Sequence, residues 1–175
     1  IHGYSPSLGI QSVREAVAAS LNRRFGMNYG PEHIFMASGA AGALAHAFRA
    51  VTKPGDEILT FAPFFPEYRP YVEGTGAVLK VVSADTESFQ IHFEAFEEML
   101  GEQVAAVLIN SPNNPSGVVY SEETIRTLVQ ILKRKQEEYG HDIFLISDEP
   151  YREIVFDGKA APYVSRYYDN TISCY

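Results

Sequence analysis

The sequence has little cysteine and no tryptophan: Cys174 is the only thiol in 175 residues. One cysteine cannot form an intrachain disulfide, and it cannot supply the paired thiolates of a zinc ribbon or finger. The five histidines show no metal-ligand spacing. We therefore expect neither a disulfide framework nor a metal site.

Basic residues are also scarce. The chain has 14 Lys and Arg against 22 Asp and Glu, a formal net charge of −8, and its basic residues form no stripe. Nucleic acid and anionic membrane surfaces are therefore not expected as partners. No apolar run approaches the roughly 20 residues of a membrane-spanning helix, and no signal-peptide pattern precedes Ile1. We expect a cytoplasmic protein.

Apolar runs that resemble buried strands alternate with segments of helical periodicity. Such runs occupy residues 57–61, 78–82, 104–109 and 143–146, with shorter strands expected at 34–37 and 171–175. Strands that are apolar on both faces, separated by helices, are typical of a mostly parallel sheet covered on two sides. The prediction is a three-layer α/β/α sandwich forming one domain over residues 1–175, with residues 157–170 as a surface excursion.

The helical segments have recognisable ends. Apolar residues at helical spacing predict a helix over residues 10–25, with Gly26 as its C-terminal stop. Small residues at 38–42 turn into an alanine-rich helix that extends to about Val51. Further helices are expected before Gly74, over 93–100, and from Ser121, whose hydroxyl is a natural cap.

Two motifs carry most of the chemistry: Asn110–Gly117 and Asp148–Tyr151. Each follows an apolar strand directly, and ligands of open α/β sheets bind beyond the carboxyl ends of the strands. The amide of Asn114, the carboxylate of Asp148 and the phenol of Tyr151 can converge there on one small heteroaromatic ligand. Because Asp148 emerges from apolar surroundings, its charge needs a cationic partner, which a protonated ring nitrogen would provide.

Two further segments support a ligand site less specifically. The turn at Gly39, Ala40 and Ala41 joins a predicted strand to a helix, and small residues at a helix N-terminus suit a phosphate. A tight turn without any ligand explains it equally well. Phe65, between prolines, could stack on a planar ligand, although core packing is the ordinary role of a lone aromatic.

Together these motifs resemble the large domain of the fold type I pyridoxal-phosphate enzymes, specifically the class I and II aminotransferases. The resemblance rests on five segments in the family's order. They are residues 4–9, 38–44, 63–68, 110–117 and 148–151.

The resemblance implies a role for each matching residue. Gly39, Ala40 and Ala41 would hold the phosphate of pyridoxal 5′-phosphate through backbone N–H groups, and Phe65 would stack on its ring. Asp148 would pair with the pyridine nitrogen, while Asn114 and Tyr151 would bind the phenolic oxygen, with Asp148 and Tyr151 as the catalytic pair present. Tyr4 would reach the phosphate of a neighbouring subunit.

The same resemblance implies a homodimer that moves an amino group between an amino acid and a 2-oxo acid. The family's cofactor-attaching lysine is expected just beyond Tyr175, and no lysine of this chain stands at a matching position. The small domain and the N-terminal arm are likewise missing. We therefore expect a partial large domain that is inactive alone.

Other functions remain open at this point. The same fold and motifs suit a pyridoxal-phosphate C–S lyase or a 1-aminocyclopropane-1-carboxylate synthase. A non-catalytic regulatory domain that binds the cofactor is an alternative of another class. A nicotinamide dehydrogenase is disfavoured because the glycine fingerprint G-x-G-x-x-G does not occur.

Overall fold

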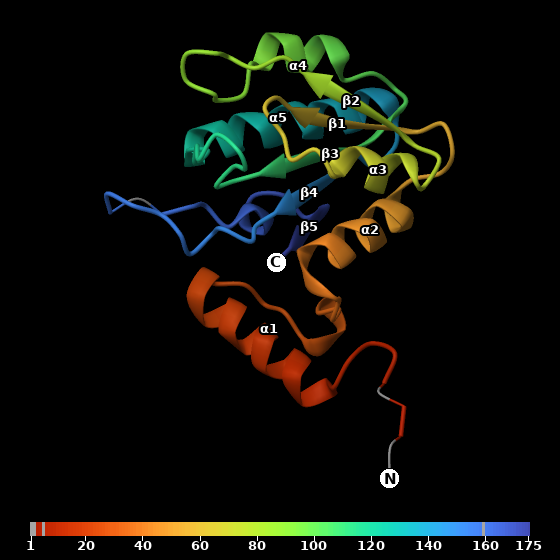
Figure 1. Cartoon of the computed structure of the whole chain (residues 1–175), viewed down its shortest axis with the longest axis vertical. Coiled ribbons are helices and arrows are strands. Elements are labelled where there is room, and N and C mark those ends of the chain that lie inside the picture. The colour runs from red at the N-terminus through yellow and green to blue at the C-terminus, as the bar shows by residue number, and fades with distance from the viewer. Residues whose placement is uncertain (1–2, 5, 159) are drawn as a thin grey trace. The chain divides into compact units, whose positions relative to one another are not determined.

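The structure, a computed structural model, describes residues 3–4, 6–158 and 160–175. It divides into two compact units, Ile1–Gly39 and Ala40–Tyr175 (Figure 1). The first contains helix α1 (Gln11–Phe25) and the 3-10 turn η1 (Pro31–His33). Gly26 caps α1 in the left-handed conformation (φ 68°) and donates its N–H to the Asn22 carbonyl, which confirms the predicted stop.

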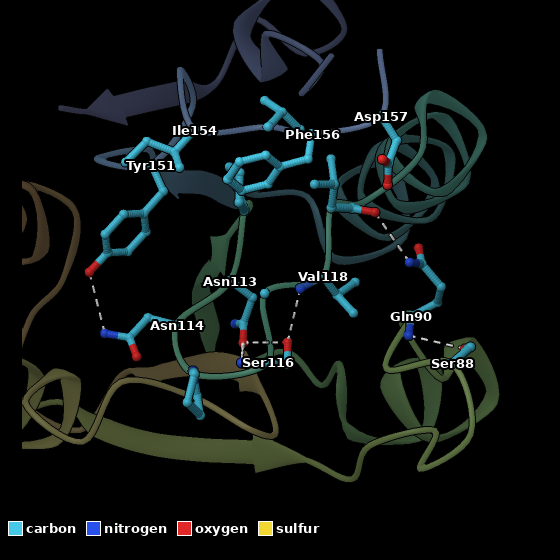
Figure 2. Close-up of a pocket in the computed structure, with 15 residues that line it drawn as sticks. Ser88, Gln90, Asn113, Asn114, Ser116, Val118, Tyr151, Ile154, Phe156 and Asp157 are labelled. Carbon is cyan, nitrogen blue, oxygen red and sulfur yellow. Dashed lines mark hydrogen bonds between the residues drawn. The ribbon is translucent and has the colours of Figure 1, made fainter. Parts of the chain in front are cut away.

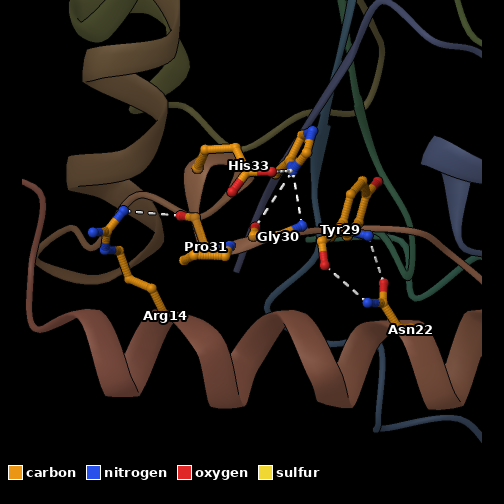
Figure 3. Close-up of polar contacts among 7 residues, drawn as sticks. Arg14, Asn22, Tyr29, Gly30, Pro31 and His33 are labelled. Atoms are coloured by element: carbon orange, nitrogen blue, oxygen red, sulfur yellow. Dashed lines mark hydrogen bonds and ion pairs between the residues drawn. The ribbon is translucent and has the colours of Figure 1, made fainter.

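Side chains of α1 tie the helix to the segment that follows it (Figure 3). Arg14 donates to the carbonyl of Pro31 at 2.9 Å. Asn22 bonds twice to the backbone of Tyr29, donating through Nδ2 at 2.9 Å and accepting through Oδ1 at 2.8 Å. These contacts are internal to the first unit and hold its two elements together.

The strand predicted at residues 34–37 is wrong. Ile34 has extended backbone angles (φ −112°, ψ 122°), but residues 34–37 pair with no strand in the described part of the chain. Extended conformation alone does not make a strand, because the ladder hydrogen bonds need a neighbour.

The second unit is built on a five-stranded sheet with the order β2-β1-β3-β4-β5. The strands are β1 (Glu57–Phe61), β2 (Val78–Val82), β3 (Val104–Asn110), β4 (Phe144–Asp148) and β5 (Thr171–Cys174). All neighbouring pairs are parallel. The sheet therefore presents all its carboxyl ends at one edge, as the sequence predicts.

Helices cover both faces of this sheet (Figure 1). Phe48 of α2 (Gly39–Val51) and Val72 of α3 (Tyr68–Glu73) share one apolar cluster with Leu108. Phe96 of α4 (Phe93–Met99) and Leu128 of α5 (Glu122–Tyr139) belong to the cluster on the opposite face. Consecutive strand residues alternate between the two clusters, and the predicted three-layer α/β/α architecture is confirmed.

Helix α5 has defined signals at both ends. The Ser121 hydroxyl accepts the N–H of Thr124 at 3.0 Å, confirming the predicted cap. Gly140 ends the helix in the left-handed conformation (φ 71°). None of the described helices has the length and apolarity to cross a bilayer.

The prediction that residues 157–170 form a surface excursion is wrong in part. The 3-10 turn η2 (Val164–Arg166) lies in this segment, and Tyr163, Val164 and Tyr168 are buried. The Tyr168 hydroxyl donates to Gln136 Oε1 and to the Ile143 carbonyl, each at 2.6 Å. These buried residues lie among polar neighbours in the sequence, so no apolar run marks them. The two tyrosine rings bury much surface and hold the segment on the core.

Candidate functional site

The carboxyl ends of β3 and β4 meet at the candidate site. Asn110 and Asp148, their last residues, are register partners. A cavity of about 180 Å³ opens there, entirely within the second unit. Its lining comprises Ala40, Ala41, Leu44, Phe65, Tyr71, Asn114, Asp148, Pro150 and Tyr151. The fold therefore brings Asp148 together with five other residues that the sequence predicts to contact a ligand: Ala40, Ala41, Phe65, Asn114 and Tyr151.

Asp148 is the electrostatic centre of this cavity. Only 5% of the residue is exposed, and its Oδ2 accepts a hydrogen bond from the Tyr68 hydroxyl at 2.5 Å. Its Oδ1 is buried and has no hydrogen-bond partner in the described chain. Burial raises the pKa of Asp148, and the hydrogen bond from Tyr68 opposes that shift. The cavity thus contains a buried carboxylate oxygen that lacks a donor.

Tyr68 is a site residue to which sequence reasoning assigned no role. It is almost fully buried, and burial beside Asp148 raises the pKa of its phenol far above the usual value, so it remains a proton donor. The available signal was its position: Tyr68 follows Phe65 by three residues, across the turn that leads into α3, so both rings lie near the same strand end. Their rings meet edge to face, with centroids 5.6 Å apart.

Asn114 and Tyr151 line the cavity, and their polar ends face each other (Figure 2). Asn114 Nδ2 and the Tyr151 hydroxyl are 3.4 Å apart, at the long limit of a hydrogen bond. Tyr151 is 36% exposed, so its phenol is accessible to a ligand. The two polar groups therefore point to a common location, as predicted from the strand ends.

A larger cavity of about 720 Å³ adjoins the first and shares Asn114 and Tyr151 with it. Its other walls come from residues 112–119 and 154–157, with Ser88 and Gln90 (Figure 2). The described residues that line it include no buried charged group. We assign the candidate site to the smaller cavity because the buried carboxylate lies there.

Only part of the predicted phosphate turn lines the smaller cavity. Ala40 and Ala41 contribute to its wall, and the first-turn N–H groups of α2 have no intrahelical acceptor. Gly39 starts α2 with a left-handed backbone (φ 71°) that favours glycine. Gly39 and the exposed Tyr4 belong to the first unit. Their roles remain predictions.

Glu149, next to Asp148, does not line the cavity. It is buried and forms an ion pair with Arg152, and its Oε1 accepts hydrogen bonds from Ser147 at 2.8 Å and Ser173 at 3.1 Å. Glu149 therefore has a structural role beside the cavity and makes no contact in it. The described residues also contain no group of three or more potential metal ligands.

Comparison with known proteins identifies the family. Residues 1–175 match the model described as aminotransferase class I and II. Two curated relatives are a probable aspartate/prephenate aminotransferase of Thermus aquaticus, 35% identical over 156 residues, and an aspartate aminotransferase of Thermotoga maritima, 36% identical over 154 residues. These alignments cover 89% and 87% of this chain, respectively, and 39% of each relative.

Solved structures agree with the sequence comparison. The crystal structure of an aminotransferase from Eubacterium rectale superimposes with a TM-score of 0.97 at 50% identity, covering 99% of this chain and 44% of that one. The Thermotoga maritima aspartate aminotransferase gives a TM-score of 0.89 at 32% identity, covering 98% and 45%. The chain thus spans about two fifths of the length of the relatives it matches. It belongs to the class I and II aminotransferase family.

Proposed function

We propose that the whole protein transfers an amino group between an amino acid and a 2-oxo acid with pyridoxal 5′-phosphate as cofactor. The observation that carries the proposal is the unpartnered, buried Oδ1 of Asp148 at the floor of a cavity. An acceptor in that position is costly unless a donor arrives. A pyridine N–H is a donor of the right charge.

The other residues of the cavity fit the same cofactor. Phe65 offers an aromatic face or edge to a planar ring. Ala40 and Ala41 add little bulk beside the start of α2, where backbone N–H groups, with that of Gly39, would hold a phosphate. Because alanine has no polar side-chain atom, phosphate binding there would depend on the backbone. Asn114 and Tyr151 would donate to the phenolic oxygen.

The chemistry follows from the charges that these residues hold. When bound, the cofactor provides a cationic ring that withdraws electrons from the α-carbon of an amino acid. Asp148 would hold the proton on the ring nitrogen, and the hydrogen bond from Tyr68 favours the ionised form of Asp148. Asn114 and Tyr151 would stabilise negative charge at the phenolic oxygen. The protein thereby sets the orientation and the electronics of the cofactor.

Two further features are part of the proposal. We expect a homodimer in which Tyr4 reaches the phosphate bound by the partner subunit. We also expect the cytoplasm as compartment, where the buried free thiol of Cys174 stays reduced.

The direct test uses the whole protein with added cofactor. Purified protein should bind pyridoxal 5′-phosphate, with quenching of its tyrosine fluorescence, and should convert an amino donor and a 2-oxo acceptor in equal amounts. Release of ammonia and a 2-oxo acid without an acceptor would show elimination instead. Failure to bind the cofactor at all would contradict the proposal.

A further inference from the structure

Asn110 makes two contacts that join separate parts of the candidate site. It is the last residue of β3, and only 4% of it is exposed. Its Nδ2 donates to the backbone carbonyl of Asp148 at 2.9 Å. Its Oδ1 accepts the backbone N–H of Asn114 at 2.6 Å. One buried amide therefore connects the end of β4 with the turn that follows β3.

These contacts link Asp148 and Asn114, which would hold the ring nitrogen and the phenolic oxygen of the cofactor. The side chain of Asp148 can face the cavity only if the backbone at the end of β4 is fixed, and Asn114 starts from a turn with no ladder hydrogen bonds of its own. We propose that Asn110 is a positioning residue, which sets the separation of Asp148 and Asn114 and thereby the affinity for the cofactor. This inference rests on the proposed function above.

The residue type matches that role. The connection needs a donor and an acceptor on one short planar group, which asparagine provides. Aspartate keeps the acceptor for Asn114 but cannot donate to the Asp148 carbonyl when ionised. Alanine loses both contacts. Glutamine places its amide one methylene farther out.

Holding the sheet together is not sufficient to explain these bonds. Strands β3 and β4 are paired over five registered positions from Ala106 to Asn110, and both strands are buried in the core. The amide of Asn110 adds hydrogen bonds at the carboxyl ends of the strands, to the Asp148 carbonyl and the Asn114 N–H, outside the regular strand pairing. Its loss should therefore affect the cavity more than the fold.

Asn113, in the same turn, offers a matched control (Figure 2). Its Oδ1 accepts from the backbone N–H and the hydroxyl of Ser116, at 3.0 and 2.7 Å, and its Nδ2 donates to the Pro63 carbonyl at 3.3 Å. Asn113→Ala thus removes the bonds to Ser116 within the turn and the bond to Pro63, without touching the link between Asn110 and Asp148.

The experiment measures the dissociation constant for pyridoxal 5′-phosphate by fluorescence titration of the whole protein, together with urea unfolding of each variant. Asn110→Ala should raise that constant about tenfold, because both hydrogen bonds that fix Asp148 and Asn114 are lost. Asn110→Asp should raise it as well, and it serves as the test should the alanine variant fail to fold. Asn113→Ala should bind the cofactor within about twofold of the wild type, even if its urea midpoint falls as far as that of Asn110→Ala.

A double-mutant cycle with Asn114→Ala shows whether Asn110 acts through that residue. The Asn110→Ala change should cost less affinity in the Asn114→Ala background than in the wild type. Wild-type affinity in both Asn110 variants, or an equal loss in Asn113→Ala, would overturn the inference while leaving the proposed function intact. A wild-type protein that binds no cofactor would instead overturn the proposed function.

Discussion

The Tyr68 hydroxyl donates a hydrogen bond to Asp148 Oδ2 at 2.5 Å, and this bond joins the start of α3 to the end of β4 beneath the cavity. It occupies one carboxylate oxygen and leaves Oδ1 as the oxygen that still needs a donor. It also opposes the rise in the pKa of Asp148 that burial causes. Tyr68 therefore favours the ionised carboxylate that a cationic ring requires.

Tyr68→Phe should weaken cofactor binding by about tenfold, because one buried hydrogen bond to a charged group is lost. It should also raise the pKa of Asp148 further, so the fall in affinity at acid pH should begin at a higher pH than in the wild type. Fluorescence titrations of pyridoxal 5′-phosphate between pH 5 and pH 8 would measure both effects.

Tyr168→Phe is the matched control for that change. Tyr168 is also a buried tyrosine with hydrogen bonds to Gln136 and Ile143, but it packs in the cluster on the opposite face of the sheet. The Tyr168→Phe variant should lose stability without losing affinity for the cofactor. Equal affinity losses in the two variants would show that Tyr68 contributes only to the fold.

Asp148→Asn should change stability and cofactor binding in opposite directions. Without cofactor, the buried carboxylate has no cationic partner among the described residues, and replacing it with a neutral amide should stabilise the protein by about 1 kcal/mol at neutral pH. The same variant should bind the cofactor poorly. Urea unfolding of the apoprotein and fluorescence titration would measure the two effects.

The pH dependence of the stability difference follows from the raised pKa of Asp148. Below the unfolded-state pKa, near 4, the group is protonated in both the folded and the unfolded state. The wild type then loses little stability relative to Asp148→Asn. As the pH rises from there towards the folded-state pKa, the unfolded chain ionises while the folded carboxyl stays protonated, so wild-type stability falls. The advantage of Asp148→Asn should therefore grow with pH over this range and level off above the folded-state pKa. A difference that does not depend on pH would contradict this assignment.

Much of the second unit follows from its sequence. The bounds of β1 and β2 agree with their apolar runs at 57–61 and 78–82, because strands buried on both faces give uninterrupted apolar segments. The strand ends also brought Asn114 and Asp148 together, since parallel topology places all carboxyl ends at one edge. Local pattern and tertiary structure agree in these segments.

The failures have a common physical cause, which is that they depend on partners remote in the sequence. Residues 34–37 have the composition of a strand but pair with none in the part of the chain described here. Tyr68 and Asn110 are ordinary polar residues until folding places them beside Asp148. Periodicity predicts which residues are buried, whereas the acceptor of each buried hydrogen bond depends on the three-dimensional structure.

The cap of α5 permits a prediction about the fold that is independent of the site. Ser121→Ala removes the acceptor of the Thr124 N–H and should destabilise the protein by about 1 kcal/mol. Ser121→Asp keeps an acceptor and adds negative charge at the helix N-terminus, so it should retain most of the stability. Thermal unfolding of the two variants would distinguish them, and equal losses would show that the cap bond contributes nothing.

The central claim is that Asp148 Oδ1 accepts a hydrogen bond from a protonated pyridine ring. Nitrogen-15 NMR of the whole protein, loaded with pyridoxal 5′-phosphate labelled at the ring nitrogen, tests it most directly. We expect a protonated nitrogen at neutral pH in the wild type and an unprotonated one in Asp148→Asn. An unprotonated ring nitrogen in the wild type, or the same signal in both proteins, would contradict it.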